Sequence, residues 1–150
     1  MQKIATSRFG WSAHKVMEIA EKLYQEGFIS YPRTETNSFP NTMNLPGLIE
    51  LQRQNPDWGN HAARLIDYAN QHYQKPRNGQ KDDKAHPPIH PVRAPTRQLT
   101  ADEKRLYDLV TRRFLACCSK DAIGDETTIH ASVQFEGFHC SGLQIRERNF

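Results

Sequence analysis

The sequence predicts a mainly α-helical protein that ends in a β-hairpin. In the first 118 residues, apolar side chains recur at the three- and four-residue spacing of amphipathic helices. After Ser119 the spacing changes to a strict alternation of apolar and polar residues, which is typical of half-buried strands. No apolar run approaches the roughly 18 residues that a membrane-spanning helix needs, so we expect no membrane partner.

The first predicted helix begins after Ser12 and ends at Gly27. Serine is a preferred N-cap residue, and glycine readily takes the left-handed conformation that ends many helices. A run with strand propensity follows at residues 28–31, and residues 32–46 are rich in Pro, Asn, Thr and Ser, so we expect a loop there. The apolar stripe of this helix consists of Val16, Ile19, Ala20, Leu23 and Tyr24.

Three further helices are expected. A short helix is predicted within "LPGLIELQRQ" (residues 45–54), and a longer one from Trp58 to Tyr73. The last helix begins at a capping box formed by Thr100 and Glu103. The stripe of the longer helix includes Ala62, Leu65, Ile66 and Ala69, and that of the last helix includes Leu106, Leu109, Val110 and Phe114.

The alternating residues after Ser119 predict two strands joined at Glu136 and Gly137. Gly142 allows a β-bulge, after which the apolar residues resume on the shifted phase. The apolar residues of the hairpin are Ile129, Ala131, Val133, Phe135, Phe138, Cys140, Leu143 and Ile145.

Positive charge is concentrated in one loop. The whole chain has a formal net charge of +3, which alone does not establish a nucleic-acid partner. Residues 75–97 contain six basic and two acidic side chains, so this segment nets +4, and its five prolines predict an irregular loop. We call this segment the basic loop.

The cysteine pattern does not suggest a disulfide framework. The chain has three cysteines, and two of them, Cys117 and Cys118, are adjacent. Both follow an apolar helical pattern, so we expect buried free thiols in a reducing compartment.

The stretch "GFISYPRTETN" (residues 27–37) has the chemistry of a phosphate-attacking tyrosine. Pro32 biases Tyr31 towards extended backbone, and in an extended chain Arg33 points to the same side as Tyr31. A guanidinium there can grip the phosphate that the phenol attacks. Because a free phenol has a pKa of about 10, such a nucleophile needs a base, a metal ion or cationic surroundings. The alternative is that Tyr31 only packs, with its hydroxyl hydrogen-bonded.

The stretch "KAHPPIHP" (residues 84–91) carries two histidines, His86 and His90. A metal site would need a helix to bring both onto one face, and the three prolines forbid that helix. A rigid loop of this kind suits phosphate contact or acid–base assistance, and the alternative is a proline-rich surface linker.

Three stretches of the sequence together resemble the central region of type IA DNA topoisomerases: "AEKLYQEGFISYPRTETNSFP", "KAHPPIHP" and "RRFLACCS". Within that family, they resemble the alpha form of eukaryotic topoisomerase III. The resemblance covers essentially all 150 residues. It implies an ATP-independent enzyme that cleaves and reseals one DNA strand through a 5′-phosphotyrosine. Another strand passes through the gap between the two steps.

The resemblance also assigns roles to individual residues. It implies that Tyr31 attacks the strand, that Arg33 contacts the scissile phosphate and that His86 lies in the active site. Glu21 and Gln25 share a helix face, but the acid and the amide are swapped in bacterial relatives, so their separate roles stay open. The further residues expected to contact DNA are Ser30, Thr34, Glu35, Lys81 and Lys84.

The resemblance divides the chain into two parts. Residues 1–118 correspond to the third, tyrosine-bearing domain, which is related to winged helices, and residues 119–150 begin the β-rich second domain, which acts as a gate. No DxD cluster occurs here, so Mg²⁺ is expected in a domain absent from this chain. With no metal site of its own, the fragment is expected to be inactive alone.

The expected partners follow from the same resemblance. They are single-stranded DNA, a RecQ-family helicase and an OB-fold accessory protein, in the nucleus or in a mitochondrial form. Two other classes remain open, a nucleic-acid-binding helical module without catalysis and a structural or partner-binding domain. Covalent capture of DNA separates the enzyme from both.

Overall fold

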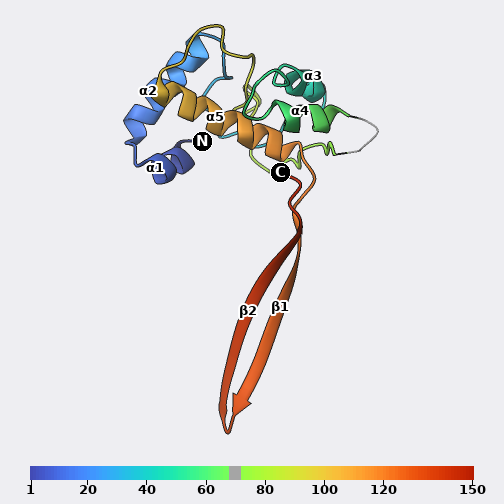
Figure 1. The fold of residues 1–150 in the computed structure, drawn as a ribbon. Coiled ribbons are helices and arrows are strands. Elements are labelled where there is room, and N and C mark those ends of the chain that lie inside the picture. The colour runs from blue at the N-terminus through green and yellow to red at the C-terminus, as the bar shows by residue number, and fades with distance from the viewer. Residues whose placement is uncertain (68–71) are drawn as a thin grey trace.

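The computed structural model describes residues 1–67 and 72–150. Its helices form one body, from which a two-stranded antiparallel hairpin extends (Figure 1). The predicted class, helical with a C-terminal hairpin, is therefore confirmed. The elements are α1 (Gln2–Phe9), α2 (Ala13–Gln25), α3 (Leu45–Glu50), α4 (Gly59–Ile66), α5 (Ala101–Cys117), β1 (Ile123–Val133) and β2 (Glu136–Glu147).

Helix α2 begins and ends where the sequence predicts. The Ser12 hydroxyl accepts a backbone hydrogen bond at 3.1 Å. At the other end Gly27 has a φ of 74°, and the Gly27 and Phe28 amides donate to the Tyr24 and Leu23 carbonyls at 2.8 and 2.9 Å. This is a Schellman motif. It turns the chain so that Phe28 enters the core beside Leu23.

Helix α5 packs against α2 and carries much of the core. The predicted capping box is present, since the Thr100 hydroxyl accepts from the Glu103 amide and the Glu103 carboxylate accepts from the Thr100 amide. All four residues predicted for its apolar stripe are buried: Leu106, Leu109, Val110 and Phe114.

The predicted strand at residues 28–31 forms a minimal pairing with the end of the basic loop. Ile29 and Pro91 make an antiparallel bridge. The Ser30 amide donates to the His90 carbonyl, and the Val92 amide donates to the Phe28 carbonyl, both at 2.9 Å. This pairing brings the basic loop to the C-terminal end of α2.

Two helical expectations differ from the structure. Helix α1 was not predicted, because its sequence has no apolar stripe, and of its residues only Ala5 is buried. The helix predicted from Trp58 to Tyr73 ends at Ile66 as α4. Tyr73 instead forms a bridge with Ser119, and Ala69 lies outside the described residues.

The hairpin turns earlier than predicted. Val133 pairs with Glu136, so the turn is formed by residues 134–135 and not by Glu136 and Gly137. Gly142 pairs with Thr127 in regular register, and the register shift lies between Ile123 and Gly124, at the start of β1. The expected bulge at Gly142 is therefore wrong.

Both faces of the hairpin are exposed, so the expectation of half-buried strands is also wrong. Phe138 pairs with Ala131 and Leu143 pairs with Glu126. These pairs lie on opposite faces, because side chains alternate along a strand. Phe138 is 60% exposed and Leu143 67%. The alternation of apolar and polar residues fixes which side chains share a face of the hairpin, but not what covers that face.

The cysteine prediction holds in part. Cys118 is buried, whereas Cys117 is exposed, because it lies on the outer side of the last turn of α5. Among the described residues no helix is long and apolar enough to cross a membrane.

Candidate active site

The Tyr31 ring lies between two other rings. Its centroid is 4.4 Å from that of His86, with the planes tilted by 31°, and 5.4 Å from that of Tyr24, which meets it edge-on. Tyr31 is half-buried, and its hydroxyl makes no hydrogen bond within the described part of the chain. The structure thus brings Tyr31 and His86 together across 55 residues of sequence and leaves the phenol oxygen available.

Arg33 lies against α2. Its Nε donates to the Glu21 carboxylate at 2.6 Å, and a terminal guanidinium nitrogen contacts the same oxygen. Glu21 and Tyr24 are three residues apart and share a helix face. Arg33 and Tyr31 therefore lie over the same face of α2, and Gln25 is exposed one turn beyond Glu21.

The Asp83 carboxylate connects the tyrosine loop to the histidine. It accepts the Thr34 hydroxyl at 3.0 Å, the Ala85 amide at 2.9 Å and the His86 amide at 2.7 Å. The His86 amide and then the Ala85 amide are the main causes that hold the pKa of Asp83 well below its usual range. In return, the Asp83 amide donates to the Thr36 hydroxyl at 3.0 Å.

Asp83 also fixes the direction of the His86 ring. The Nδ1 atom of His86 lies 3.4 Å from an Asp83 carboxylate oxygen. The other ring nitrogen, Nε2, has no hydrogen-bond partner among the described residues. The ring is stacked on Tyr31 and has one nitrogen free, so it can contact a phosphate bound at Tyr31.

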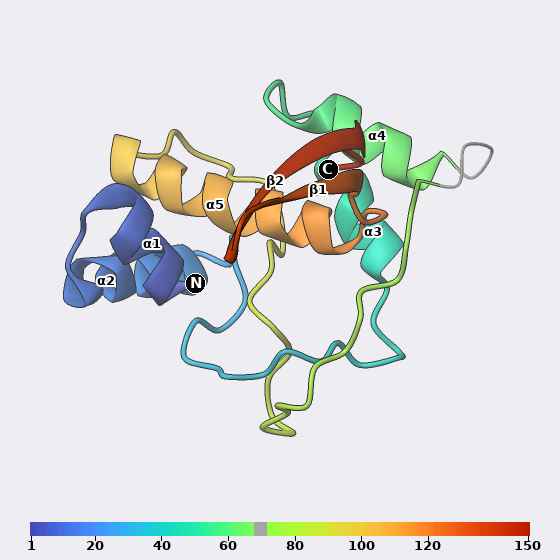
Figure 2. The same cartoon turned by 90° about the horizontal axis from the view of Figure 1, so that it is seen from below.

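The two loops are joined further along their length, as Figure 2 shows. The Asn37 amide donates to the Lys81 carbonyl, and the Gly79 amide donates to the Asn37 carbonyl, both at 2.9 Å. A Cβ on Gly79 would lie 2.3 Å from the Asn37 side chain. A side chain at position 79 would displace the Asn37 carboxamide, whose oxygen accepts the Lys81 amide at 2.9 Å.

Ser30 and His90 are structural in this arrangement. Ser30 is buried, and its hydroxyl accepts the His90 amide at 3.0 Å and donates to the Pro88 carbonyl at 3.4 Å. His90 is 5% exposed, packs near Phe39 and Phe114, and has a pKa lowered by burial. Ser30 was expected to line the DNA surface. It instead joins the two loops, because the backbone pairing of residues 28–31 turns it inward.

Two cations of the basic loop are bonded to groups at the C-terminal end of α2 and the N-terminal end of α5. Arg97 bonds the Glu26 carboxylate at 2.7 Å and the Glu103 carboxylate at 2.9 Å, which raises the pKa of Arg97. Arg93 donates to the Glu26 carbonyl at 2.5 Å and lies over the Phe28 ring. These contacts anchor the loop to the end of α2.

The expected DNA-contacting lysines lie on the surface. Lys81 is 3.4 Å from the Glu35 carboxylate, and Lys84 is 2.9 Å from that of Asp82. Such exposed ion pairs are weak and can exchange for a phosphate. The net charge of the basic loop therefore overstates the charge it offers to a ligand.

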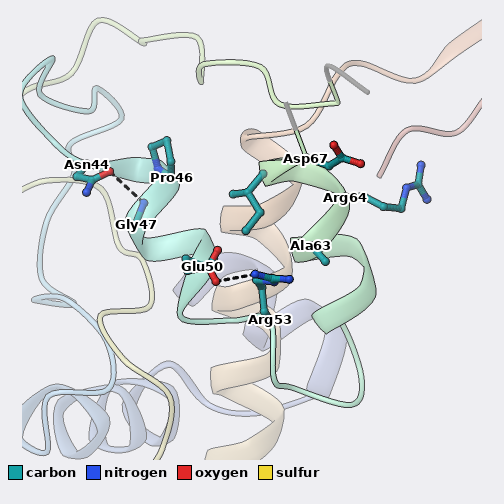
Figure 3. A pocket seen from close by; sticks show the side chains of 9 residues that line it. Asn44, Pro46, Gly47, Glu50, Arg53, Ala63, Arg64 and Asp67 are labelled. Carbon is teal, nitrogen blue, oxygen red and sulfur yellow. Dashed lines mark hydrogen bonds and ion pairs between the residues drawn. The ribbon is translucent and has the colours of Figure 1, made fainter. Parts of the chain in front are cut away.

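The hollow between α3 and α4 does not belong to this site (Figure 3). It has a volume of about 690 Å³. An Arg53–Glu50 ion pair of 2.8 Å and the Asn44 cap on Gly47 line it. None of the side chains around Tyr31 reaches it.

The part of the chain that the structure describes also has no group of three or more His, Cys, Asp and Glu side chains placed to hold a metal ion.

Sequence reasoning missed Asp83 and Tyr24. In the sequence, the aspartates of the basic loop were counted only as negative charges. An aspartate that can accept the amides two and three residues after it is, however, a turn signal. Tyr24 was assigned to the apolar stripe of α2, but it is 42% exposed and contacts Tyr31.

Comparison with known proteins gives consistent results. The family model described as DNA topoisomerase matches residues 1–150. The chain is 49% identical over 150 residues to DNA topoisomerase 3-alpha of Drosophila melanogaster and 47% identical over 150 residues to that of Homo sapiens. It is 43% identical over 164 residues to DNA topoisomerase 3 of Saccharomyces cerevisiae. All of this chain is covered, but only 12%, 15% and 25% of those proteins.

Proposed function

The chain belongs to the DNA topoisomerase family, and we propose that it is the segment of a type IA enzyme that carries the strand-cleaving tyrosine. The observation that supports this most is the Tyr31 hydroxyl. It has no hydrogen-bond partner among the described residues, the His86 ring lies against the Tyr31 ring, and Arg33 is held on the same face of α2 by Glu21. Because the chain spans a quarter or less of these relatives, the activity belongs to a longer protein.

The proposed reaction is a transesterification. The Tyr31 hydroxyl gives up its proton, and its oxygen attacks a backbone phosphorus and forms a phosphotyrosine ester with the 5′ phosphate. The bond from phosphorus to the 3′ oxygen breaks, and that oxygen takes up a proton and leaves as a 3′ hydroxyl. The same hydroxyl later attacks the ester, releases Tyr31 and reseals the strand. One phosphoester bond replaces another in each step, so no ATP is consumed. A second strand passes through the gap between the steps.

Arg33 and His86 are proposed to stabilise the charge on the phosphate. Glu21 engages the Nε edge of the Arg33 guanidinium over the same helix face as Tyr31, so the remaining terminal N–H groups are oriented to donate to a phosphate there. The free Nε2 of His86 can donate to a second phosphate oxygen. Both groups act on the non-bridging oxygens, where negative charge grows during attack.

The DNA strand is proposed to continue over the exposed side chains around this site. Gln25, Thr34 and Glu35 are close to Tyr31 in the sequence and are not buried, while Lys81 and Lys84 can exchange their weak ion pairs for phosphates.

The remaining parts of the enzyme are proposed to lie in the longer protein. We propose that the longer protein supplies the carboxylates that hold Mg²⁺. We assign residues 1–118 to a winged-helix-related domain and residues 119–150 to the start of a β-rich gate. We also propose that the isolated chain does not relax supercoiled DNA. The RecQ-family helicase, the OB-fold partner and the nuclear location stay predictions.

Covalent capture tests the proposal. A 3′-labelled single strand is incubated with the longer protein, denatured and separated by gel. Wild type should leave labelled DNA attached to protein, and Tyr31→Phe should leave none. Tyr24→Phe is the matched control, because it removes the hydroxyl of the ring that contacts Tyr31, and it should retain the adduct. An adduct that survives Tyr31→Phe would contradict the proposal and favour a binding module without catalysis.

A further inference from the structure

Two histidines face each other across the hairpin. His130 of β1 and His139 of β2 are directly paired in the antiparallel register. Their ring centroids lie 6.2 Å apart, with the planes tilted by 33°. Within the described residues, neither imidazole makes a hydrogen bond or an ion pair. Both rings therefore have nitrogen atoms that can bind an external ligand.

The polar face of the hairpin lets paired side chains meet. Side chains alternate along a strand, so Thr128 and Ser141, the next pair but one along the ladder, lie on the same face as the two histidines. The Thr128 and Ser141 hydroxyl oxygens are 2.8 Å apart. Directly opposed side chains on this face thus come together with the backbone as it stands. Cys140 lies on the opposite face.

The space beside the histidines is open. A hollow of about 440 Å³ is lined by both rings and by Gly137. Gly137 pairs with Ser132, on the same face and nearer the turn, and a β-carbon on Gly137 would meet nothing within 4 Å. Both histidines are exposed, and the hairpin extends away from the helical body (Figure 1). The two imidazoles can therefore turn towards one ligand that keeps part of its water shell.

The charge of the hairpin favours a cation. Residues 123–147 contain four acidic side chains and one basic side chain, a net charge of −3, whereas the whole chain carries +3. Glu126 shares the face of His130 but lies four residues away, about 13 Å along the strand. In the described part of the chain no third His, Cys, Asp or Glu side chain completes a metal-binding group here. A metal ion at this pair would have two protein ligands and water.

We propose that His130 and His139 together bind one first-row divalent metal ion of the Zn²⁺, Cu²⁺ and Ni²⁺ class, each through one imidazole nitrogen. These ions favour imidazole, whereas Mg²⁺ favours oxygen ligands. Zinc–nitrogen distances of about 2.0–2.1 Å hold two ring centroids roughly 5 Å apart in a tetrahedral site, so the rings need to approach by about 1 Å. The inference goes beyond the proposed function, because it concerns the hairpin and needs neither DNA nor Tyr31.

A bound ion would link the two strands. The strands bury no apolar residue, so the hairpin has little else besides its backbone ladder to hold it together. A ligand that binds only the paired strands stabilises them by mass action. At a free Zn²⁺ concentration 100 times the dissociation constant, amide exchange in β1 and β2 should slow about 100-fold. Exchange in the middle of α5 should not change.

A zinc chloride titration of the 150-residue chain at pH 7.5 tests the site, with the imidazole proton resonances as the readout. One equivalent should shift the His130 and His139 resonances together. His130→Gln and His139→Gln should each weaken this binding at least tenfold. The double variant should lose little more, because a single imidazole already leaves a one-ligand site. Equal affinity in wild type and either single variant, or the same shifts with magnesium chloride, would overturn the proposal.

The matched control is His14→Gln. His14 is another exposed histidine and lies 3.5 Å from the Glu18 carboxylate on one helix face, so it tests whether any exposed histidine would serve. This variant should keep the wild-type affinity of the hairpin. At pH 5.5 protons compete for the imidazole nitrogens, so the affinity should fall at least tenfold. Affinity that is the same at both pH values would assign the zinc to carboxylates and overturn the proposal.

The zinc content of the longer protein gives the final test. After equilibrium dialysis at one free Zn²⁺ concentration, wild type should hold one equivalent more than His130→Gln/His139→Gln. Equal zinc content would overturn the proposal. Tyr31→Phe should leave the zinc content unchanged, and His130→Gln/His139→Gln should still form the covalent DNA adduct. Failure of this inference and failure of the proposed function are therefore distinguishable.

Discussion

The Asp83 carboxylate shows how one side chain joins two distant motifs. It bonds Thr34 from the tyrosine loop and the backbone of His86 from the basic loop. Both bonds hold the His86 ring where it stacks on Tyr31. We therefore infer that Asp83 positions the site without touching the DNA.

The two neighbouring aspartates give a matched pair for testing this. Asp83 accepts the Ala85 and His86 amides, whereas Asp82 accepts the Lys84 amide at 2.8 Å. In Asp83→Ala, hydrogen exchange should become faster at Ala85 and His86. In Asp82→Ala it should become faster at Lys84 only. Identical exchange profiles for the two variants would contradict the positioning role.

Arg33 should not tolerate replacement by lysine. Its Nε and a terminal nitrogen both face Glu21, so the fork is oriented before a phosphate arrives. Lysine keeps the charge but cannot form a bidentate contact. In the longer protein, Arg33→Lys should slow cleavage at least tenfold, which is about 1.4 kcal/mol in the barrier. Single-turnover cleavage rates measure this, and a rate equal to wild type would rule out the clamp.

At the scale of elements, the C-terminal end of α2 directs the chain into the site. The Schellman motif at Gly27 turns Phe28 into the core, and the next residues pair with the basic loop. Replacing Gly27 by alanine should destabilise the fold by about 1–2 kcal/mol, because a β-carbon is strained at a φ of 74°. Gly27→Asn should cost less, since asparagine tolerates this conformation. Urea unfolding of both variants is the measurement, and equal losses would argue against backbone strain.

The N-terminal end of α5 is held by the Glu103 carboxylate. This side chain is 3% exposed and accepts bonds from Arg97, Lys22 and the Thr100 amide. The Arg97 hydrogen bonds are the main cause that holds the pKa of Glu103 well below its ordinary value of 4.5. The Glu103 carboxylate therefore stays ionised in the folded chain at a pH where it is already protonated in the unfolded chain.

The stabilisation from Glu103 should therefore depend on pH. It should be complete above about pH 4.5 and be lost as the pH falls below that value, because the folded-state pKa is the lower one. At neutral pH, Glu103→Gln should lower the free energy of unfolding by about 2 kcal/mol. The difference from wild type should shrink between pH 5 and pH 3. The exposed Glu35→Gln is the control, and a difference that stays constant over this range would refute the linkage.

At the scale of the molecule, the hairpin and the helical body are separate (Figure 1). The strands bury no apolar residue, and a two-stranded hairpin is marginally stable in water. In the isolated chain, amides of β1 and β2 should exchange at least 100-fold faster than those in the middle of α5. In the longer protein we expect the hairpin to become protected. Equal protection of the hairpin and α5 in the isolated chain would show that the hairpin is stable by itself.

The sequence by itself determined the features that depend on neighbouring residues. The cap at Ser12, the left-handed Gly27 and the capping box of α5 were all predicted, because each involves residues within four positions of one another. The sequence also predicted that Tyr31 and Arg33 share a side, and both lie over one face of α2, although residues 32 and 33 form a bend.

The tertiary structure alone decided what depends on segments far apart. It brought His86 onto Tyr31, turned Ser30 inward and paired Arg97 with Glu26 and Glu103. It also left the hairpin uncovered on both faces. The spacing of residues along a segment determines which side chains share one face of it. Which of them are buried, paired or free is decided only when loops of forty residues or more close and bring other segments against them.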